Sequence, residues 1–191
     1  MGLIDRLAAK DRGKAARARA AASLYAAAVE QARAPGFYTA LGVPDTIDGR
    51  FELIVLHVHL VCRRLAAADA GSGAAGAEMA QALFDAMFRD MDRNLREMGV
   101  GDPSIPRRIR AMIEAYYGRV KAYDAALAQG GDALVIALAR NVYDAGAVPG
   151  AGTPPAVARL ADYARRAAVA LAAQPDLAAG RVAFPPVASA S

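Results

Sequence analysis

The segment from Phe51 to Leu65 is the feature that most restricts how this chain can fold. It reads FELIVLHVHLVCRRL, and large apolar side chains fall on nearly every face when it is drawn as a helix. A helix that is apolar all round must be covered on all sides, so we expect it at the centre of the fold. We do not expect it to span a membrane, because polar residues interrupt it: Glu52, His57, His59, Arg63 and Arg64.

Two further segments carry matched helical periodicity. One apolar stripe repeats at spacings of 4 and 3 and consists of Phe84, Phe88, Met91, Leu95 and Met98. A second stripe has the same spacing and consists of Ile109, Ile113, Tyr116, Val120, Tyr123 and Leu127. The short turn GVGDPSIP joins them, which predicts an antiparallel helical hairpin.

The remaining segments also favour helices, and no stretch predicts a strand. We therefore predict an all-α fold: a single helical domain of about six helices in which helices three and four form the hairpin. The expected helices cover 15–34, 45–67, 77–98, 105–128, 133–143 and 154–173. Phe37 to Leu41 is expected to add one helical turn.

The basic charge of the chain is concentrated at its N-terminus. The net charge is +4, and the first twenty residues carry all of it. We interpret residues 1–14 as a basic flexible arm, 15–185 as the helical domain and 186–191 as a disordered tail. The arm suits an anionic partner such as RNA or lipid headgroups, although a solvated leader without a partner is an equally good interpretation. The cations of residues 1–20 that we expect to contact such a partner are Arg6, Lys10, Arg12, Lys14, Arg17 and Arg19.

The two histidines do not form a metal site. His57 and His59 are two residues apart, so they point to different sides of a helix and cannot both bind one ion. A single haem ligand is an alternative, but a hydrogen-bonded core histidine is the favoured interpretation. The single cysteine, Cys62, lies in the most apolar helix and is expected to be an inert buried thiol.

The aspartates near residue 90 could suggest the Mg²⁺ site of a helical enzyme. Their spacing does not suit such a site, and each has a cation nearby. We expect opposite-charge pairs one helical turn apart instead: Asp85–Arg89, Asp92–Arg96 and Arg93–Glu97. The sequence therefore predicts no catalytic residue, no metal site and no cofactor.

Gly118 interrupts an otherwise strong helical pattern in AYYGRVKAY. Glycine in a helix interior costs about 1 kcal/mol relative to alanine. Either the close approach of another helix of the same chain or the approach of a binding partner would account for it.

Several long segments together resemble the ubiquinol–cytochrome c chaperone family. They include DGRFELIVLHVHLVCRRL, FRDMDRNLREMGVGD, YYGRVKAYD and LAAGRVAFP, in the order of the family. The resemblance covers about Ser23 to Pro185. It implies a helical assembly factor for respiratory complex III, without catalytic residues, whose mitochondrial relatives handle newly made cytochrome b near the ribosomal exit.

This resemblance implies a partner and candidate contacts. The expected client is newly made cytochrome b, bound and later released. A second assembly factor and peripheral contact with a membrane or ribosome are further expected partners, and DNA is not. We find no secretion signal and expect a bacterial cytoplasmic protein at the inner membrane. The candidate contact residues come from the matching motifs: Phe37, Tyr38, Arg50, Phe88, Tyr117 and Gly118.

Two other functions remain compatible with these residues. The first is a haem- or quinone-binding helical module, with His57 or His59 as the ligand. The second is a scaffold that contacts other assembly factors and never cytochrome b itself.

Overall fold

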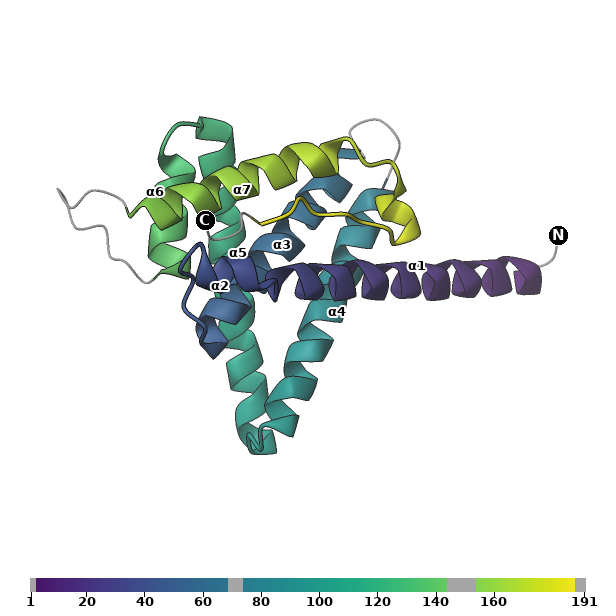
Figure 1. Ribbon diagram of the computed structural model, residues 1–191. Helices are drawn as coiled ribbons and strands as arrows, with labels where there is room; N and C mark the ends of the chain where they lie inside the picture. Colours follow the sequence, from purple (N-terminus) through teal and green to yellow (C-terminus); the bar gives the residue numbers. More distant parts are fainter. Residues whose placement is uncertain (1–2, 69–73, 144–153, 188–191) are drawn as a thin grey trace.

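The chain folds into helices arranged around one central helix (Figure 1). The computed structural model describes residues 3–68, 74–143 and 154–187. No strand occurs among these residues, which confirms the all-α prediction. The α-helices are α1 (Leu3–Ala32), α2 (Pro35–Thr39), α3 (Ile47–Ala68), α4 (Ala75–Glu97), α5 (Ile105–Gln129), α6 (Ala133–Val142) and α7 (Pro155–Ala172). Two 3-10 turns, η1 (Asp102–Ser104) and η2 (Asp176–Ala179), complete the list.

Helix α3 lies at the centre, as its sequence predicts. Every residue from Glu52 to Val61 is buried. Helices α1, α4 and α7 pack extensively against it, and α5 and α6 also contact it. Its first turn is capped by Thr46, whose Oγ1 accepts a hydrogen bond from the Gly49 N–H at 3.1 Å. Near its other end, Arg64 donates to the carbonyl oxygens of Leu171 and Gln174, both at 3.1 Å, and so binds the backbone where α7 ends.

Helices α4 and α5 form the predicted antiparallel hairpin (Figure 1). Gly99 ends α4 with a φ of +76°, a left-handed conformation that favours glycine. The N–H of Val100 then returns to the Leu95 carbonyl at 3.0 Å, so the helix closes in a Schellman turn. The apolar stripe of α5 faces inward as expected, with Tyr116 and Tyr123 buried. The α4 stripe faces inward as far as Leu95, but Met98 is 56% exposed.

Helix α1 is longer than expected. It begins at Leu3, so residues 3–14 belong to the same helix as the buried residues Leu24 and Ala28. In Figure 1 the N-terminal part of α1 extends beyond the other helices. Whether residues 1–14 behave as a flexible arm remains a prediction. The expected loop at 144–153, and the last four residues of the expected tail, lie outside the described residues.

The C-terminal segment after α7 returns across the bundle. Leu177 is buried, and the 3-10 turn that contains it contacts α1 and α3. Gly180, with a φ of +81°, packs so closely on α1 that an added Cβ would lie 2.9 Å from the Ala20 Cα. Gln31 of α1 donates to the Pro185 carbonyl at 3.2 Å. The segment thus covers one side of α1 and α3.

Within the described ranges, no helix is long and apolar enough to cross a bilayer.

Candidate functional site

The six candidate contact residues lie in three places. Phe37 is fully buried and belongs to the core. Tyr38 and Arg50 lie together where α2 meets the start of α3. The remaining three belong to the α4–α5 hairpin. Phe88 is buried, with only 7% of its surface exposed, whereas Tyr117 is 55% exposed and Gly118 is also exposed. The sequence motifs are therefore partly core motifs and partly surface motifs.

Phe37 packs in an aromatic cluster around His57. Its ring centroid lies 5.4 Å from that of His57 and 4.9 Å from that of Tyr163, both edge to face. Phe184 from the C-terminal segment contacts His57 at 5.0 Å. Because Phe37 has no exposed surface, it stabilises the core, and we do not retain it among the contact residues that we propose.

His57 is a core histidine with both ring nitrogens hydrogen-bonded. Nδ1 lies 2.7 Å from the Leu53 carbonyl, which can only accept, so Nδ1 carries the proton. Nε2 therefore accepts from the Tyr163 hydroxyl at 2.8 Å, and that hydroxyl accepts from Gln31 at 3.1 Å. Burial lowers the pKa of His57 to about 4, which keeps the ring neutral. Neither nitrogen is free to bind haem.

His59 is also buried but is less well satisfied. Its Nε2 has no hydrogen-bond partner and lies 3.4 Å from the Asp124 Oδ1 on α5. Burial lowers the pKa of His59 to about 4, although Asp124 acts in the opposite direction. Arg63 also lies 3.4 Å from the same carboxylate oxygen. The side chain is 2% exposed, so its ring is not accessible to a ligand at the surface.

Tyr38 and Arg50 line a shallow cavity of about 310 Å³ between α2 and the start of α3. The Arg50 guanidinium lies 6.0 Å from the centroid of the Tyr38 ring, and its Nε donates to Asp45 at 2.6 Å. That hydrogen bond lowers the pKa of Asp45. The Tyr38 hydroxyl donates to the Ala32 carbonyl at 2.8 Å. Arg50 is therefore paired in place, whereas Arg33, which also lines the cavity, makes no ion pair among the described residues.

The α4–α5 hairpin carries the largest group of aromatic contacts. We call Phe84, Phe88, Tyr116 and Tyr117 the aromatic seam. Phe84 lies 4.6 Å from Phe88, 5.3 Å from Tyr116 and 5.6 Å from Tyr117, measured between ring centroids. Tyr116 and Phe88 are buried, Phe84 is half-buried and Tyr117 is exposed. The seam thus extends from the core to the surface through rings in contact.

Gly118 follows Tyr117 directly and is open to solvent. A Cβ added there would meet no atom within 4 Å. Gly49 of the DGRFEL motif differs, because a Cβ there would lie 2.1 Å from the Pro44 carbonyl oxygen. Packing within the fold therefore explains why a glycine occupies position 49, whereas no contact of the described residues explains the glycine at position 118. Of the two explanations raised by its sequence, internal helix packing is wrong.

Arg119, next along α5, fixes the hairpin to the central helix. It points inward, and its Nε donates to the two carboxylate oxygens of Glu52 at 2.7 and 2.6 Å. Glu52 is 5% exposed, and its burial raises its pKa while Arg119 opposes that shift. The sequence motif gave no signal of this pair, because its members are 67 positions apart.

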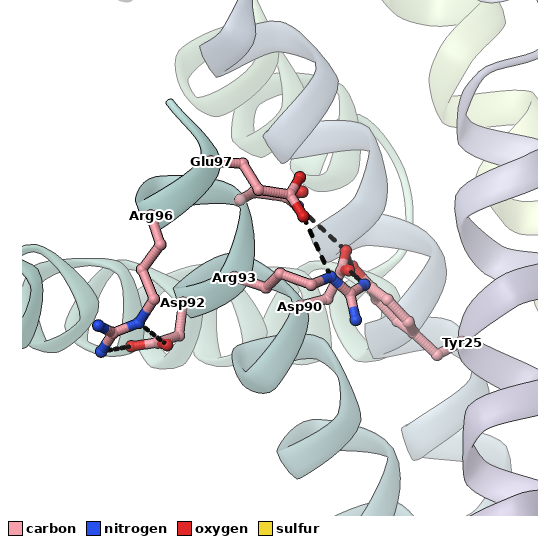
Figure 2. Close-up of polar contacts among 7 residues, drawn as sticks. Tyr25, Asp90, Asp92, Arg93, Arg96 and Glu97 are labelled. Carbon is pink, nitrogen blue, oxygen red and sulfur yellow. Dashed lines mark hydrogen bonds and ion pairs between the residues drawn. The ribbon is translucent and has the colours of Figure 1, made fainter. Parts of the chain in front are cut away.

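The carboxylates of α4 are held by hydrogen bonds and ion pairs, as Figure 2 shows. Asp90 accepts from the Tyr25 hydroxyl of α1 at 2.8 Å and also pairs with Arg93. Asp92 accepts from Arg96 at 2.7 Å. The expected pairs Asp92–Arg96 and Arg93–Glu97, the latter at 4.0 Å, are confirmed.

The third expected pair, Asp85–Arg89, is wrong. Asp85 accepts a hydrogen bond from Gln81 at 2.8 Å instead, and Arg89 makes no ion pair among the described residues. The sequence could not distinguish the two partners, since Gln81 and Arg89 both lie one turn from Asp85. In the described part of the chain, no three His, Cys, Asp or Glu residues are grouped so that they could hold a metal ion.

Cys62 belongs to α3 and is half-buried, with its Sγ facing α4 at 3.7 Å from the Ala80 carbonyl oxygen. Burial raises the pKa of the thiol to about 12. A thiol that stays protonated is a poor nucleophile, as the sequence predicted.

Comparison with known proteins identifies the family to which this arrangement belongs. Residues 39–184 match the family model of the ubiquinol–cytochrome C chaperones. The chain is a member of this family. A crystal structure of the Cbp3 homolog from Brucella abortus superimposes with a TM-score of 0.77 at 34% sequence identity, over 95% of this chain and 97% of that one.

Curated relatives of this ubiquinol–cytochrome C chaperone come from animals. The Xenopus laevis ubiquinol-cytochrome-c reductase complex assembly factor 1 is 27% identical over 123 residues, which are 64% of this chain and 60% of the relative. The human protein of that name is 25% identical over 125 residues, 65% of this chain and 40% of the relative. The chain thus spans about three fifths or less of the length of these relatives.

The family match begins at Thr39, the last residue of α2, and includes α3 to α7, so α1 with its N-terminal arm lies outside it. For Arg6 and Lys10, only the backbone is described. Arg12, Lys14 and Arg19 are exposed, and Arg17 forms an ion pair with Glu78 of α4. The arm therefore lies outside the residues that the family model matches.

Proposed function

We propose that this chain is an assembly chaperone for respiratory complex III that binds newly made cytochrome b and releases it for assembly. The family membership and the names of the relatives support an assembly role. We further propose that the protein is not an enzyme and works in the cytoplasm, at the periphery of the inner membrane. The mechanism consists of binding and release, so the important property is a surface that holds an apolar chain reversibly.

The observation that carries this proposal is Gly118 beside Tyr117. A glycine in the middle of a 25-residue helix lowers helix stability, and no internal contact requires it. Its missing side chain leaves the backbone of α5 accessible to a second helix. The exposed Tyr117 ring next to it offers an apolar face with a polar hydroxyl, the combination that is enriched in binding sites.

The client-binding surface that we propose therefore comprises Tyr117, Gly118 and the half-buried Phe84. Phe88 supports it from below through its contact with Phe84. An apolar helix of cytochrome b would lie along α5 with its closest approach at Gly118. Tyr38 and Arg50 remain candidate contacts in a separate cavity, where the same client or a second assembly factor could be bound.

Site-directed photo-crosslinking in cells tests the proposal. A photoreactive amino acid replaces Tyr117, and a control chain carries it at Val169, which is 73% exposed on α7. We expect crosslinks to cytochrome b from position 117 and none from position 169. Crosslinks from position 117 only to other assembly factors would instead favour the scaffold function.

Substitution of Gly118 provides a second test. Gly118→Gln places a long side chain where we expect a client helix, and Gly118→Ala places a single methyl group there. Both residues favour the helix, so folding should be retained. We expect recovery of cytochrome b with the tagged chain to fall for Gly118→Gln and to fall less for Gly118→Ala. Equal recovery with all three chains would contradict binding at this surface.

The haem-binding alternative receives no support from the histidine geometry. Both nitrogens of His57 are hydrogen-bonded within the core, and His59 is covered. An absorbance titration with haem should therefore show no histidine-dependent band, and a band lost in His59→Ala would overturn this conclusion.

A further inference from the structure

The turn that joins α4 to α5 forms a projecting end of the molecule. In Figure 1 the two helices extend together away from the other helices and meet at this turn. We call residues 98–110 the hairpin tip. It contains the Schellman turn at Gly99, the 3-10 turn Asp102–Ser104 and the first residues of α5. Its sequence, MGVGDPSIPRRIR, contains no aromatic residue.

Three arginines of the tip carry charge that the protein itself does not neutralise. Arg107, Arg108 and Arg110 are exposed, and none of them makes an ion pair among the described residues. Four carboxylates of α4 and the turn are already occupied by two other arginines, and Glu114, four residues after Arg110, is exposed and makes no ion pair among the described residues. Arg96 holds Asp92 and Asp102, while Arg93 holds Asp90 and Glu97.

The position of these arginines is unfavourable within the isolated protein. Free backbone N–H groups give the start of a helix a partial positive charge, so acidic residues are normally preferred there. The first turn of α5 has no acidic residue and itself contains Arg107 and Arg108, and Arg110 follows in the next turn. An external anion would offset this repulsion, so the charge pattern calls for an anionic partner.

Apolar side chains at the same tip specify what kind of anionic partner fits. Met98 is 56% exposed, and Val100 and Ile109 of the same tip are half-buried. Arginines next to an exposed apolar side chain suit the boundary between lipid headgroups and acyl chains. Proteins that bind single-stranded RNA normally use aromatic rings on which the bases stack, and this tip has no aromatic residue.

We propose that the hairpin tip docks the protein on an anionic lipid surface. Arg107, Arg108 and Arg110 contact the phosphate headgroups, and Met98 inserts at the acyl boundary. The contact is peripheral, since it uses a short turn rather than a helix spanning the bilayer. It rests on the peripheral membrane location proposed above and names the surface that makes the contact, and it does not depend on the identity of the client.

The N-terminal arm differs from the tip in a way that allows a matched control. Arg12, Lys14 and Arg19 are exposed cations too, but no large apolar side chain lies between residues 11 and 20. Leu3, Ile4 and Leu7 precede this comparison segment, which can attract an anionic surface at a distance but has no large apolar side chain to insert. Its attraction should therefore be screened by salt more completely than that of the tip.

Vesicle binding by the full chain measures the contribution of the tip. The tip variant is Arg107→Ala/Arg108→Ala/Arg110→Ala, and the arm variant is Arg12→Ala/Lys14→Ala/Arg19→Ala. Each removes three positive charges from exposed positions. Circular dichroism checks that both remain helical. Binding is compared on phosphatidylcholine vesicles and on vesicles that also contain phosphatidylglycerol, at low and at physiological salt.

At physiological salt we expect the tip variant to bind the anionic vesicles on the order of a hundredfold more weakly, since each arginine at such a surface contributes about fivefold. The arm variant should bind within a few fold of the unaltered chain. Equal losses in both variants, or loss only in the arm variant, would overturn the proposal. So would equal binding to neutral and anionic vesicles.

Insertion is measured separately with a single tryptophan, because the chain has none of its own. Met98→Trp places the reporter at the tip, and Val169→Trp places it at an exposed position of α7. Anionic vesicles should shift the emission of the first reporter to shorter wavelength and leave the second unchanged. If the emission spectrum of Met98→Trp does not change at a saturating concentration of anionic vesicles, the tip does not insert.

A single-stranded RNA oligonucleotide is included as the competing anion. If the unaltered chain binds it and the tip variant does not, while neither binds anionic vesicles, the tip is an RNA site and the lipid proposal is wrong. If a large excess of the RNA does not displace the unaltered chain from anionic vesicles, the result would support docking on a lipid surface.

Discussion

Arg119 of α5 holds the buried carboxylate of Glu52 on α3 with its Nε 2.6 and 2.7 Å from the two oxygens. This pair joins the hairpin to the central helix, one residue from the exposed Gly118. The side chain of Arg119 is 25% exposed and that of Glu52 6% exposed, so the carboxylate is the more strongly desolvated partner. The same turn of α5 thus faces the core through Arg119 and solvent through Gly118.

Arg119→Ala should destabilise the protein by about 3 kcal/mol at neutral pH, because it leaves a buried carboxylate without its partner. The pKa of Glu52 is already raised by burial and should rise further. A raised pKa means that the folded state takes up this proton more readily than the unfolded state. The cost of the substitution should therefore shrink as the pH falls toward the folded pKa of Glu52.

Urea unfolding of both chains across the acidic range measures this difference. The double variant Glu52→Gln/Arg119→Ala is the control. It removes the carboxylate that titrates, so the free-energy cost relative to the unaltered chain should vary less with pH. A constant cost of Arg119→Ala at all pH values would show that Glu52 is not charged in the folded protein.

His57 gives a pH dependence of the opposite sign. Its folded pKa is lowered to about 4, so the unfolded chain binds the proton first. Its contribution to stability should be fully present above the unfolded value, near pH 6.5, and should be lost as the pH falls toward 4. The loss should amount to about 3 kcal/mol for a shift of this size.

His57→Phe removes this proton uptake and also removes two hydrogen bonds. We expect a variant that is less stable at pH 7 and whose free energy of unfolding falls less steeply between pH 6.5 and 4. Chemical denaturation at several pH values gives both quantities. A slope as steep as that of the unaltered chain would assign the proton uptake elsewhere, with His59 as the next candidate.

Gly118→Ala should stabilise the isolated protein by about 1 kcal/mol, because alanine favours the helix and its Cβ meets no other atom. For a chain of this size, the melting temperature should rise by about 2–4 °C. Thermal unfolding followed by circular dichroism measures the shift. A lower melting temperature would mean that the glycine serves the fold, which would remove the main support for the client surface.

Asp90 and Asp92 offer a comparison within one helix. Asp90 connects α4 to Tyr25 of α1, whereas Asp92 pairs with Arg96 on its own helix (Figure 2). Asp90→Ala leaves a part-buried hydroxyl without its acceptor and should cost about 2 kcal/mol. Asp92→Ala removes an exposed pair that solvent screens, so it should cost less than Asp90→Ala. Equal costs in urea unfolding would contradict the structural role of Asp90.

The sequence was sufficient to predict the fold class because the main signals are local. The run of apolar residues in α3 shows that it is central, and the spacing of Ile109, Ile113 and Tyr116 shows which face of α5 is buried. Gly99 was predictable as a helix end for the same reason. Each of these inferences uses residues within a few turns of one another.

The candidate site was less predictable because it depends on contacts between distant segments. Motif membership alone could not separate Phe37, which is buried against Tyr163, from Tyr117, which is exposed. Met98 continues the α4 stripe in sequence, but the helix ends there and exposes it. Gly49 and Gly118 both occur inside helical sequence patterns. Only the structure shows that a Cβ at Gly49 would collide with the Pro44 carbonyl, whereas a Cβ at Gly118 would not meet another atom.

The return of the C-terminal segment across α1 and α3 bears on how the protein is made. Gln31 binds the Pro185 carbonyl, 154 positions later, and His57 packs against Phe184. While residues 177–187 are still inside a ribosome, α1 and α3 lack this cover. The chain therefore passes through a stage of synthesis at which its own core is exposed, and it completes its fold only after release of that segment. Until that segment is released, this proposed chaperone is itself an incompletely folded chain with part of its core uncovered.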